Sequence, residues 1–398
     1  MKILHVTNFF KPSWDTGGIA RSAYELSREL ASRGHEVTVY TTDGKNRLDV
    51  KKDRPVDVDG IETYYFKNAS TTLAKANMPL PLAVSPVARR EVRDFDIIHL
   101  HGFRTIPSAV VQHYAKKYKV PYVVQPRGTA PRSIKPLEKK LFDSIIGDRI
   151  IYGAERLIAS STFESGQFKG LFPQIDSRRI VHLPNGVEAD AYGNLPEKGR
   201  FRRRFGINQH TGLILYVGRI HQRKGLDVLV RSFSKVQKKA TLAIVGPDDG
   251  YLGELKKLVI SSGVDDKVVL TGPLYGREKY EAYVDSDLFV LPSKDTYESF
   301  GNVAIEALRC GTPVILTTNC GVAEWLNDKV GRIVNCNELE LWEAIEQVLD
   351  DRSLKESCKL EGMRLISTEF NWKPIVDRLE GIYSQILDGR SIKTRTIQ

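Results

Sequence analysis

Two glutamates, Glu298 and Glu306, lie eight positions apart in a segment whose residue types suit a binding site. An apolar run, Leu288–Leu291, precedes them, and a second one, Val314–Leu316, follows. The segment is therefore predicted to fold as strand, loop, helix, strand, with Glu298 just before the helix and Glu306 well inside it. Carboxylates at these two places can accept hydrogen bonds from neutral hydroxyl groups.

The start of this predicted helix is a candidate anion site. Ser299 is predicted to cap the helix, and the N–H groups of the first turn attract a phosphate together with the helix dipole. The residues concerned are Phe300, Gly301, Asn302 and Val303. Two carboxylates would then flank a bound phosphate, an arrangement that suits a sugar on one side and a ribose on the other.

The whole string D-T-Y-E-S-F-G-N-V-A-I-E-A-L-R-C-G-T-P-V resembles the donor signature of retaining GT-B glycosyltransferases, the large group typified by family 4. Spacing by itself would equally allow a surface helix with solvated acids. The resemblance extends over nearly the whole chain and is most specific over residues 213–316. It implies an α/β fold with two Rossmann-like parallel-sheet domains facing across a cleft and a C-terminal helix that crosses back to the first domain. It also implies that Glu298 binds the sugar's 3- and 4-hydroxyls.

Two cations stand where a diphosphate would need them. The motif Y-V-G-R-I-H-Q-R-K-G-L puts Arg219 at the carboxyl edge of a predicted strand and Lys224 at the start of a helix. Ligands of open α/β sheets bind beyond the carboxyl ends of strands, and both side chains suit phosphate oxygens. The resemblance implies that they hold the donor diphosphate and stabilise the departing nucleotide. Arg223 matches no family position and is predicted to be a solvated loop residue.

Four glycines are weaker marks of the same site. Gly246 in I-V-G-P-D-D-G and Gly272 in L-T-G-P-L-Y-G resemble the family's turns near the donor nucleotide, where backbone groups meet the base. The sequence therefore does not identify the base of the nucleotide. Gly17 and Gly18 form a Gly-rich loop after the first strand, where backbone can approach a donor phosphate or an acceptor. This loop is not G-x-G-x-x-G, which counts against a dehydrogenase.

The strand-like stretch D-I-I-H-L-H-G puts His99 and His101 on one face, because side chains alternate along a strand. His101 is nearer the carboxyl end and is the candidate to reach the cleft, whereas His99 is at least as well explained as a structural residue. Many relatives place a histidine after the next strand to contact the donor sugar. This chain has Arg127 there, which indicates a charged sugar or acceptor. The catalytic candidates are Glu298, Arg219, Lys224, His101 and Arg127.

Apolar runs alternate with helical patterns twice along the chain, which predicts two open parallel sheets. The first five runs are Ile3–Val6, Val37–Thr41, Ile97–Leu100, Tyr122–Val124 and Leu157–Ala159. The second five are Leu213–Val217, Leu242–Val245, Val268–Leu270, Leu288–Leu291 and Val314–Leu316. We predict an acceptor domain over residues 1–190, a nucleotide-sugar donor domain over residues 205–368 and a crossing helix over residues 369–390.

Composition fits this division. A chain of 398 residues is long for one core, and 41% apolar with 27% charged residues is typical of a globular protein. No apolar run approaches the roughly 18 residues of a membrane span, and the first residues lack the features of a signal peptide. The four cysteines form no C-x-x-C pair and are expected to be free thiols. We predict a cytoplasmic location.

The net charge of +10 is unevenly spread. Residues 1–199 hold 30 basic and 22 acidic residues, a net +8, and residues 200–398 hold 29 and 27, a net +2. A basic first half suits an anionic membrane surface or a lipid-linked acceptor, although a solvated basic surface is the alternative. The segment Lys135–Ile146 is either an amphipathic helix at the inner face of the membrane or a helix packed on its own domain. Nucleic acid is the weakest candidate partner.

The triplet Asp285-Ser286-Asp287 spells D-x-D, which in another glycosyltransferase fold binds a divalent metal. Here it stands directly before the strand Leu288–Leu291, where relatives carry an ordinary acid. We therefore predict no metal and no cofactor, with a nucleotide-diphosphate sugar as the donor.

No carboxylate is an obvious nucleophile for a covalent intermediate, which would need a partner acid about 5 Å away. The resemblance implies same-face displacement, in which the leaving phosphate takes the acceptor's proton, so orientation and charge stabilisation carry the catalysis. The expected function is a retaining glycosyltransferase acting on a glycan or lipid-linked saccharide, as in cell-surface polysaccharide biosynthesis. The alternatives are a sugar-nucleotide epimerase of the same fold and a nucleotide-sugar-binding protein with a decayed site.

Overall fold

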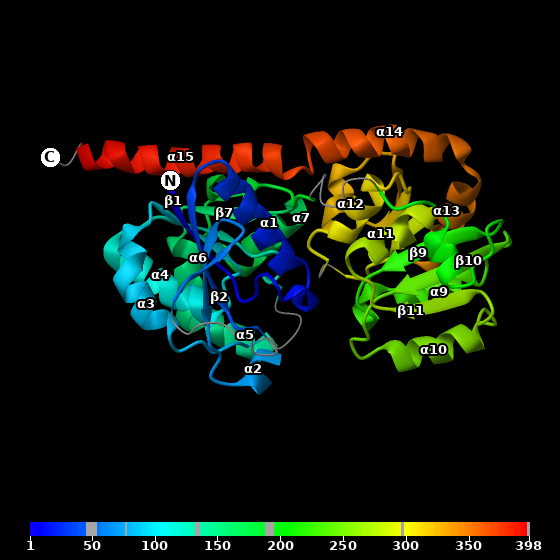
Figure 1. Cartoon of the computed structure of the whole chain (residues 1–398), viewed down its shortest axis with the longest axis horizontal. Coiled ribbons are helices and arrows are strands. Elements are labelled where there is room, and N and C mark those ends of the chain that lie inside the picture. The colour runs from blue at the N-terminus through cyan, green and yellow to red at the C-terminus, as the bar shows by residue number, and fades with distance from the viewer. Residues whose placement is uncertain (45–53, 76–77, 132–135, 188–194, 296–297, 396–398) are drawn as a thin grey trace. The chain divides into compact units, whose positions relative to one another are not determined.

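The computed structural model describes residues 1–44, 54–75, 78–131, 136–187, 195–295 and 298–395. The chain divides into two compact units (Figure 1). Unit 1 comprises Met1–Gly186 together with Trp372–Gln398, and unit 2 comprises Val187–Asn371. The short helix α8 (Arg200–Arg204), which the sequence left between the two domains, belongs to unit 2.

Unit 1 is built on an eight-stranded sheet in the order β3-β4-β2-β1-β5-β6-β7-β8. The chain reverses its direction of travel across the sheet between β1 and β5, because β1 pairs with β2 on one side and with β5 on the other. All neighbours pair in parallel except β3, which is antiparallel to β4. The strands are β1 (Lys2–Val6), β2 (Glu36–Thr42), β3 (Val56–Val58), β4 (Ile61–Phe66), β5 (Ile97–His101), β6 (Tyr122–Gln125), β7 (Arg156–Ala159) and β8 (Ile180–His182).

Helices cover both faces of this sheet, so its central strands are apolar and buried on both sides. The helices are α1 (Gly18–Ser32), α2 (Thr71–Lys75), α3 (Val84–Glu91), α4 (Ile106–Tyr118), α5 (Pro136–Phe142), α6 (Asp148–Gly153), α7 (Thr162–Leu171) and α15 (Trp372–Arg395). The last helix packs beside α1, and its apolar residues join one core cluster with Ile3 of β1 and Ile97 of β5. The expected C-terminal helix thus belongs to the first unit.

Unit 2 has a six-stranded parallel sheet in the order β11-β10-β9-β12-β13-β14. Its reversal point lies between β9 and β12, which pair through Leu288 with Ile214 and Phe289 with Leu215. The strands are β9 (Gly212–Val217), β10 (Ala240–Val245), β11 (Val268–Gly272), β12 (Leu288–Leu291), β13 (Val314–Thr317) and β14 (Gly331–Val334). Besides α8, the helices are α9 (Leu226–Phe233), α10 (Leu252–Ser261), α11 (Gly276–Asp285), α12 (Asn302–Arg309), α13 (Glu338–Asp350) and α14 (Arg352–Thr368).

The prediction of two parallel α/β sheets is confirmed, and every expected strand is present. Sequence reasoning missed β3, β4, β8 and β14, which lie at or near sheet edges. These strands mix polar and apolar residues, as in Ile61–Phe66 (I-E-T-Y-Y-F) and Gly331–Val334 (G-R-I-V), so they lack the continuous apolar run of a central strand. Among the helices in the described ranges, none is long and apolar enough to cross a membrane.

Candidate functional site

The predicted donor residues of unit 2 gather at the carboxyl ends of β9 and β12, the reversal point of the sheet. Arg219 follows β9, and Lys224 ends a single 3₁₀ turn, Gln222–Lys224, just before α9. Glu298 lies in the loop between β12 and α12. A parallel α/β sheet opens a crevice at such a point, because neighbouring loops leave in opposite directions.

The loops after β9 and β12 are fastened to each other. The Nζ of Lys224 donates to the Oε2 of Glu298, and both side chains are largely covered. The N–H of Lys294 donates to the carbonyl of Arg223 at 3.1 Å. A Cβ on Gly225 would lie 1.8 Å from the carbonyl oxygen of Pro292, so no larger residue fits this crossing. The two loops therefore act as one support for the site.

Arg223 does not behave as a solvated loop residue. Its Nε donates to the carboxylate of Asp295 at 2.5 Å, and its side chain is only 18% exposed. The ion pair adds another link between the same two loops. The sequence interpretation of Arg223 was wrong because its partner comes from a loop 72 positions away.

Arg219 is more open than Lys224. Its Nη1 donates to Asp249 at 2.5 Å, and both side chains are close to half exposed. Its carbonyl accepts from the hydroxyl of Tyr216 at 2.9 Å, which fixes the backbone directly after β9. The loop after β10, which carries Asp249, therefore also borders the Arg219 side chain.

Gly246 sits where two strand ends come together. A Cβ at this residue would lie 1.8 Å from the carbonyl oxygen of Gly218, and its N–H donates to the carbonyl of Gly272 at 3.0 Å. Gly272 has a φ of 75°, with no atom near the position of a Cβ. Close packing thus requires glycine at 246, whereas backbone conformation favours glycine at 272.

The helix after Glu298 begins later than expected. Its first residue is Asn302 and its N-cap is Gly301, at a φ of 105°, without a side-chain cap hydrogen bond. The prediction that Ser299 caps the helix was therefore wrong. Phe300 is buried, and its carbonyl accepts from the N–H of Val322 at 2.7 Å, so its ring serves the core. The positive end of the helix is then carried by Asn302 and Val303.

Glu306 lies one turn into α12 and is 9% exposed. One carboxylate oxygen accepts from the Nζ of Lys279 at 2.7 Å, and the other accepts from the hydroxyl of Tyr283 at 2.9 Å. Burial and then the charge of Glu306 raise the pKa of Tyr283 well above its usual value, so this phenol stays a donor. The carboxylate is thus held rigidly, and its predicted contact with a ribose remains a prediction.

In unit 1 the predicted residues also lie near a reversal point, between β1 and β5. Gly17 has a φ of 108° and precedes α1, of which Gly18 is the first residue. No atom lies within 4 Å of a Cβ built at Gly17, so backbone conformation and not crowding requires glycine there.

Three histidines form a buried cluster on one face of this sheet. His5 of β1 is in register with His99 of β5, and His101 follows two residues later on the same face. The Nε2 of His101 lies 3.2 Å from the Nδ1 of His5, and the Nδ1 of His99 lies 2.6 Å from the hydroxyl of Tyr383 in α15. His99 is thus bonded to a side chain and not to backbone, and His101 is buried.

Arg127 completes the cluster from the end of β6. Its φ is 50°, which is uncommon for a residue with a side chain. The Nε donates to the Nδ1 of His101 at 3.1 Å, and the Nη1 donates to the Oδ1 of Asn185 at 2.6 Å. The Nη2 is buried without a hydrogen-bond partner. Burial lowers the pKa of Arg127 to about 10, so the guanidinium stays charged at neutral pH.

The three imidazoles lie close enough together to suggest a metal site. Two observations weigh against a cation. The lone pair of the His101 Nδ1 is taken by the N–H of Arg127, and a cation would lie beside a buried guanidinium. Burial and the charge of Arg127 also lower the pKa of His5 to about 3, which keeps that ring neutral.

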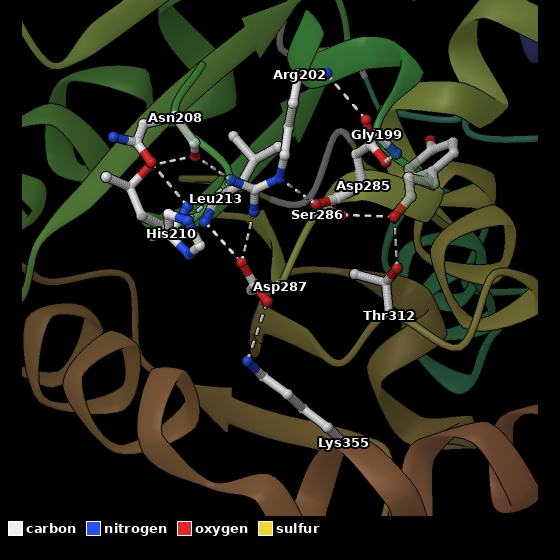
Figure 2. A network of polar contacts seen from close by, with 12 residues as sticks. Gly199, Arg202, Asn208, His210, Leu213, Asp285, Ser286, Asp287, Thr312 and Lys355 are labelled. Atoms are coloured by element: carbon white, nitrogen blue, oxygen red, sulfur yellow. Dashed lines mark hydrogen bonds and ion pairs between the residues drawn. The ribbon is translucent and has the colours of Figure 1, made fainter. Parts of the chain in front are cut away.

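The D-S-D triplet has a structural role. The carboxylate of Asp285 accepts from the backbone N–H groups of Gly199 and Arg202 at the start of α8 (Figure 2). Asp287 accepts from the Arg202 guanidinium at 2.8 Å and from the N–H of Leu213 at 2.9 Å, and it pairs with Lys355 at 3.2 Å. Asp285, at the end of α11, therefore holds the start of α8, and Asp287 ties α8 and α14 to β9, so protein donors already occupy both carboxylates.

Comparison with known proteins shows the family of the chain. The sequence model described as Glycosyl transferases group 1 matches residues 197–363, and the one described as Glycosyltransferase Family 4 matches residues 16–191. The chain belongs to the GT-B glycosyltransferases of the family 4 type. The two matched regions fall on unit 2 and unit 1 and together take in most of both.

Relatives of this glycosyltransferase match over most of their length. It is 27% identical to the D-inositol 3-phosphate glycosyltransferase of Xylanimonas cellulosilytica, over 97% of this chain and 96% of the relative. It is 28% identical to an uncharacterized glycosyltransferase of Methanocaldococcus jannaschii, over 96% and 98%. Sucrose-phosphate synthase from Thermosynechococcus elongatus has the same fold, with a TM-score of 0.76 at 20% identity, over 98% and 100%. Anabaena HepE in complex with UDP and glucose has a TM-score of 0.75 at 18% sequence identity. The match covers 97% of this chain and 100% of HepE.

Within unit 2, the glycosyltransferase brings Arg219, Lys224 and Glu298 to one reversal point. In unit 1 it brings His101 and Arg127 together. Sequence reasoning missed several neighbours of these residues, because each acts through a contact between distant segments. They are Asp249, Lys279, Tyr283, His5, Glu164 and Asn185.

Proposed function

We propose that this glycosyltransferase moves a sugar from a nucleotide-diphosphate sugar to a hydroxyl of a glycan or lipid-linked saccharide, with retention at the anomeric carbon. The observation that carries the proposal is the convergence of Arg219, Lys224, Glu298 and the start of α12 at the β9–β12 reversal point. Two cations and a helix N-terminus suit a diphosphate. A carboxylate next to them suits sugar hydroxyls.

The chemistry follows from the charge that develops on the leaving group. As the glycosidic bond breaks, negative charge grows on the diphosphate, and Arg219 and Lys224 stabilise it. Glu298 pairs with Lys224 before a substrate arrives, and we assign it the orientation of the sugar and not a nucleophilic attack. The acceptor hydroxyl then attacks from the face that the diphosphate leaves, and a phosphate oxygen takes its proton. The product keeps the anomeric configuration of the donor.

Related proteins guide the choice of ligands. HepE has been solved with UDP and glucose, and several relatives are named D-inositol 3-phosphate glycosyltransferase. We therefore start with uridine nucleotides and keep guanosine and adenosine diphosphates in the screen. Thermal shift with each diphosphate identifies the base, and hydrolysis of the matching nucleotide sugars then identifies the donor.

The anomeric outcome is measured by following the reaction of an α-linked donor by NMR. An α-linked product supports retention, and a β-linked product contradicts it. Turnover that yields an isomerised nucleotide sugar without acceptor would favour the epimerase alternative. Tight nucleotide binding with neither reaction would favour the binding-protein alternative.

We further propose that unit 1 meets an anionic membrane surface on the cytoplasmic side. Leu137 and Leu141 of α5 and Ile145 in the following turn are 82%, 62% and 53% exposed, at a helical spacing of four. These three side chains are exposed, whereas Ile146 of the same segment packs against the core of unit 1, so the segment has features of both alternatives. Lys139 and Lys140 share the helix, and such basic amphipathic helices bind membrane interfaces. Lys135, the start of the predicted segment, lies outside the described residues.

A further inference from the structure

The guanidinium of Arg127 is held by hydrogen bonds to neutral groups, and no ion pair among the described residues balances its charge. Its Nε and Nη1 each donate to a protein acceptor, and its Nη2 donates to none. The side chain is 6% exposed. In the part of the chain that the structure describes, no carboxylate forms an ion pair with it. A buried charge without a counter-ion is costly, so its retention calls for an explanation.

Glu164 is the acid whose charge acts most strongly on Arg127, and its carboxylate is hydrogen-bonded to other groups. One of its carboxylate oxygens accepts from the N–H of Gly128 at 2.6 Å, and the other accepts from the N–H and hydroxyl of Ser160, each at 2.8 Å. Glu164 thus fixes the backbone beside Arg127 without pairing with its side chain. It holds the turn in which Arg127 adopts its positive φ. Strained backbone of this kind gathers at functional sites.

The imidazoles of His5 and His101 are neutral and position the Arg127 side chain. His101 accepts from the Arg127 Nε through Nδ1, so its own proton is on Nε2, which faces the Nδ1 of His5. Three neighbouring strands, β1, β5 and β6, therefore supply a chain that runs from His5 through His101 to Arg127. This chain orients the guanidinium without neutralising it.

We propose that Arg127 recognises an anionic group, a carboxylate or a phosphate, on a sugar substrate, and that His101 and His5 are positioning residues for it. This inference rests on the proposed function, so the experiment must distinguish a failure of the inference from a failure of that function. An arginine binds such groups through two parallel N–H donors. The Asn185 oxygen on Nη1 occupies one of these two places. An incoming anion replaces it there and also takes the Nη2 that has no partner.

The anion belongs either to the donor sugar or to the acceptor, and two arms of one binding experiment separate these sources. In the donor arm, calorimetry compares UDP-glucuronate with UDP-glucose on the full chain. In the acceptor arm, it compares glucose 6-phosphate, fructose 6-phosphate and galacturonate with their neutral parent sugars in the presence of UDP. We expect the wild-type chain to prefer the anionic member at least about tenfold in one arm.

Variants assign that preference to Arg127. Arg127→Gln should reduce it to less than about twofold while leaving UDP affinity unchanged, and Arg127→Lys should keep part of it. Arg149→Gln is the control, because Arg149 is an exposed arginine of the same unit. His101→Asn keeps an acceptor near the Nε and should keep the preference. His101→Leu removes the acceptor and should lower the preference without changing the affinity for the neutral sugar, an effect that loss of stability would not produce.

The outcomes divide cleanly. Equal affinity of the wild-type chain for anionic and neutral members in both arms overturns the inference, whether or not UDP binds. A preference that survives in Arg127→Gln overturns it as well. Failure of any nucleotide to bind contradicts the proposed function instead, and the sugar phosphates and galacturonate still test Arg127 in that case.

Discussion

Lys224 and Glu298, separated by 74 positions in the sequence, are joined by a hydrogen bond between the Nζ and the Oε2. The bond links the loop after β9 to the loop after β12 at the reversal point of the unit 2 sheet. We expect an arriving diphosphate to compete with Glu298 for the ammonium group of Lys224. If Lys224 turns to the phosphate, the carboxylate becomes available to accept hydrogen bonds from the sugar. Diphosphate binding and sugar recognition would then be coupled.

The cationic pair should dominate turnover. Lys224→Ala and Arg219→Ala are each expected to lower kcat by about two to three decades, the scale of lost charge stabilisation in the transition state. Lys257→Ala is the control, since Lys257 forms an exposed pair with Glu254 on α10. Steady-state kinetics with the best donor measure the effect. Near-normal turnover in both variants would mean that the diphosphate is held elsewhere.

The two glutamates should separate nucleotide binding from transfer. Glu306→Ala is expected to weaken binding of the free nucleoside diphosphate, since a ribose contact acts whether or not a sugar is attached. Glu298→Ala should leave that binding largely intact and cut transfer. Calorimetry with the diphosphate and kinetics with the intact donor measure the two effects. The reverse order of losses would show that their roles are exchanged.

Activity should persist in excess chelator, because two cations already supply the charge that a metal would bring. Asp285→Asn should instead destabilise the fold by about 1–3 kcal/mol, since its carboxylate accepts two backbone N–H groups. Urea unfolding measures the loss in stability. Activity that disappears with chelator and returns with magnesium or manganese would contradict the first expectation, and donor-site carboxylates would then become ligand candidates.

Binding to anionic vesicles should depend on the exposed face of α5. Attraction is worth about 1 kcal/mol per basic residue near an anionic surface and is screened by salt. Co-sedimentation should therefore rise with anionic lipid and fall with added salt. Replacing Lys139 and Lys140 by glutamate, or Leu137 and Leu141 by serine, should reduce co-sedimentation without changing nucleotide affinity. A chain that ignores anionic vesicles at low salt would favour a soluble acceptor.

Stability should fall as the pH drops below the ordinary histidine range. Burial lowers the pKa of His5 from 6.5 to about 3 and lowers the pKa of His99 and His101 well below 6.5. Between these values the unfolded chain binds more protons than the folded one. The contribution of neutral burial is therefore complete above about pH 6.5 and declines below it, by up to about 1.4 kcal/mol per pH unit for each imidazole.

Urea midpoints at pH 7.5 and 5.5 measure this decline. In His5→Gln the loss of stability between pH 7.5 and 5.5 should be smaller, by the contribution of one imidazole. His113→Gln, which changes an exposed histidine of α4, should leave it unchanged. An equal slope in wild-type and His5→Gln chains would contradict neutral burial of His5.

The sequence by itself determined the two parallel sheets and the donor signature. Buried central strands such as Leu213–Val217 and Leu288–Leu291 are continuous apolar runs, because both of their faces are covered. The residues of the signature are close together in the chain, so their spacing predicts the strand–loop–helix that carries them. The sequence also singled out Gly246, and the structure explains why this residue is a glycine, because a Cβ there would collide with the carbonyl of Gly218.

The tertiary structure decided which partner each charged residue has. Lys224 pairs with Glu298, Arg219 with Asp249, and Arg127 with His101, and each partner comes from a different loop or strand. A local pattern specifies the type and direction of an element, but a contact between distant side chains depends on the order and register of the strands. The order of the strands places His5 next to His101. It also gives Asp285 and Asp287 of the D-S-D triplet structural contacts with α8 and α14.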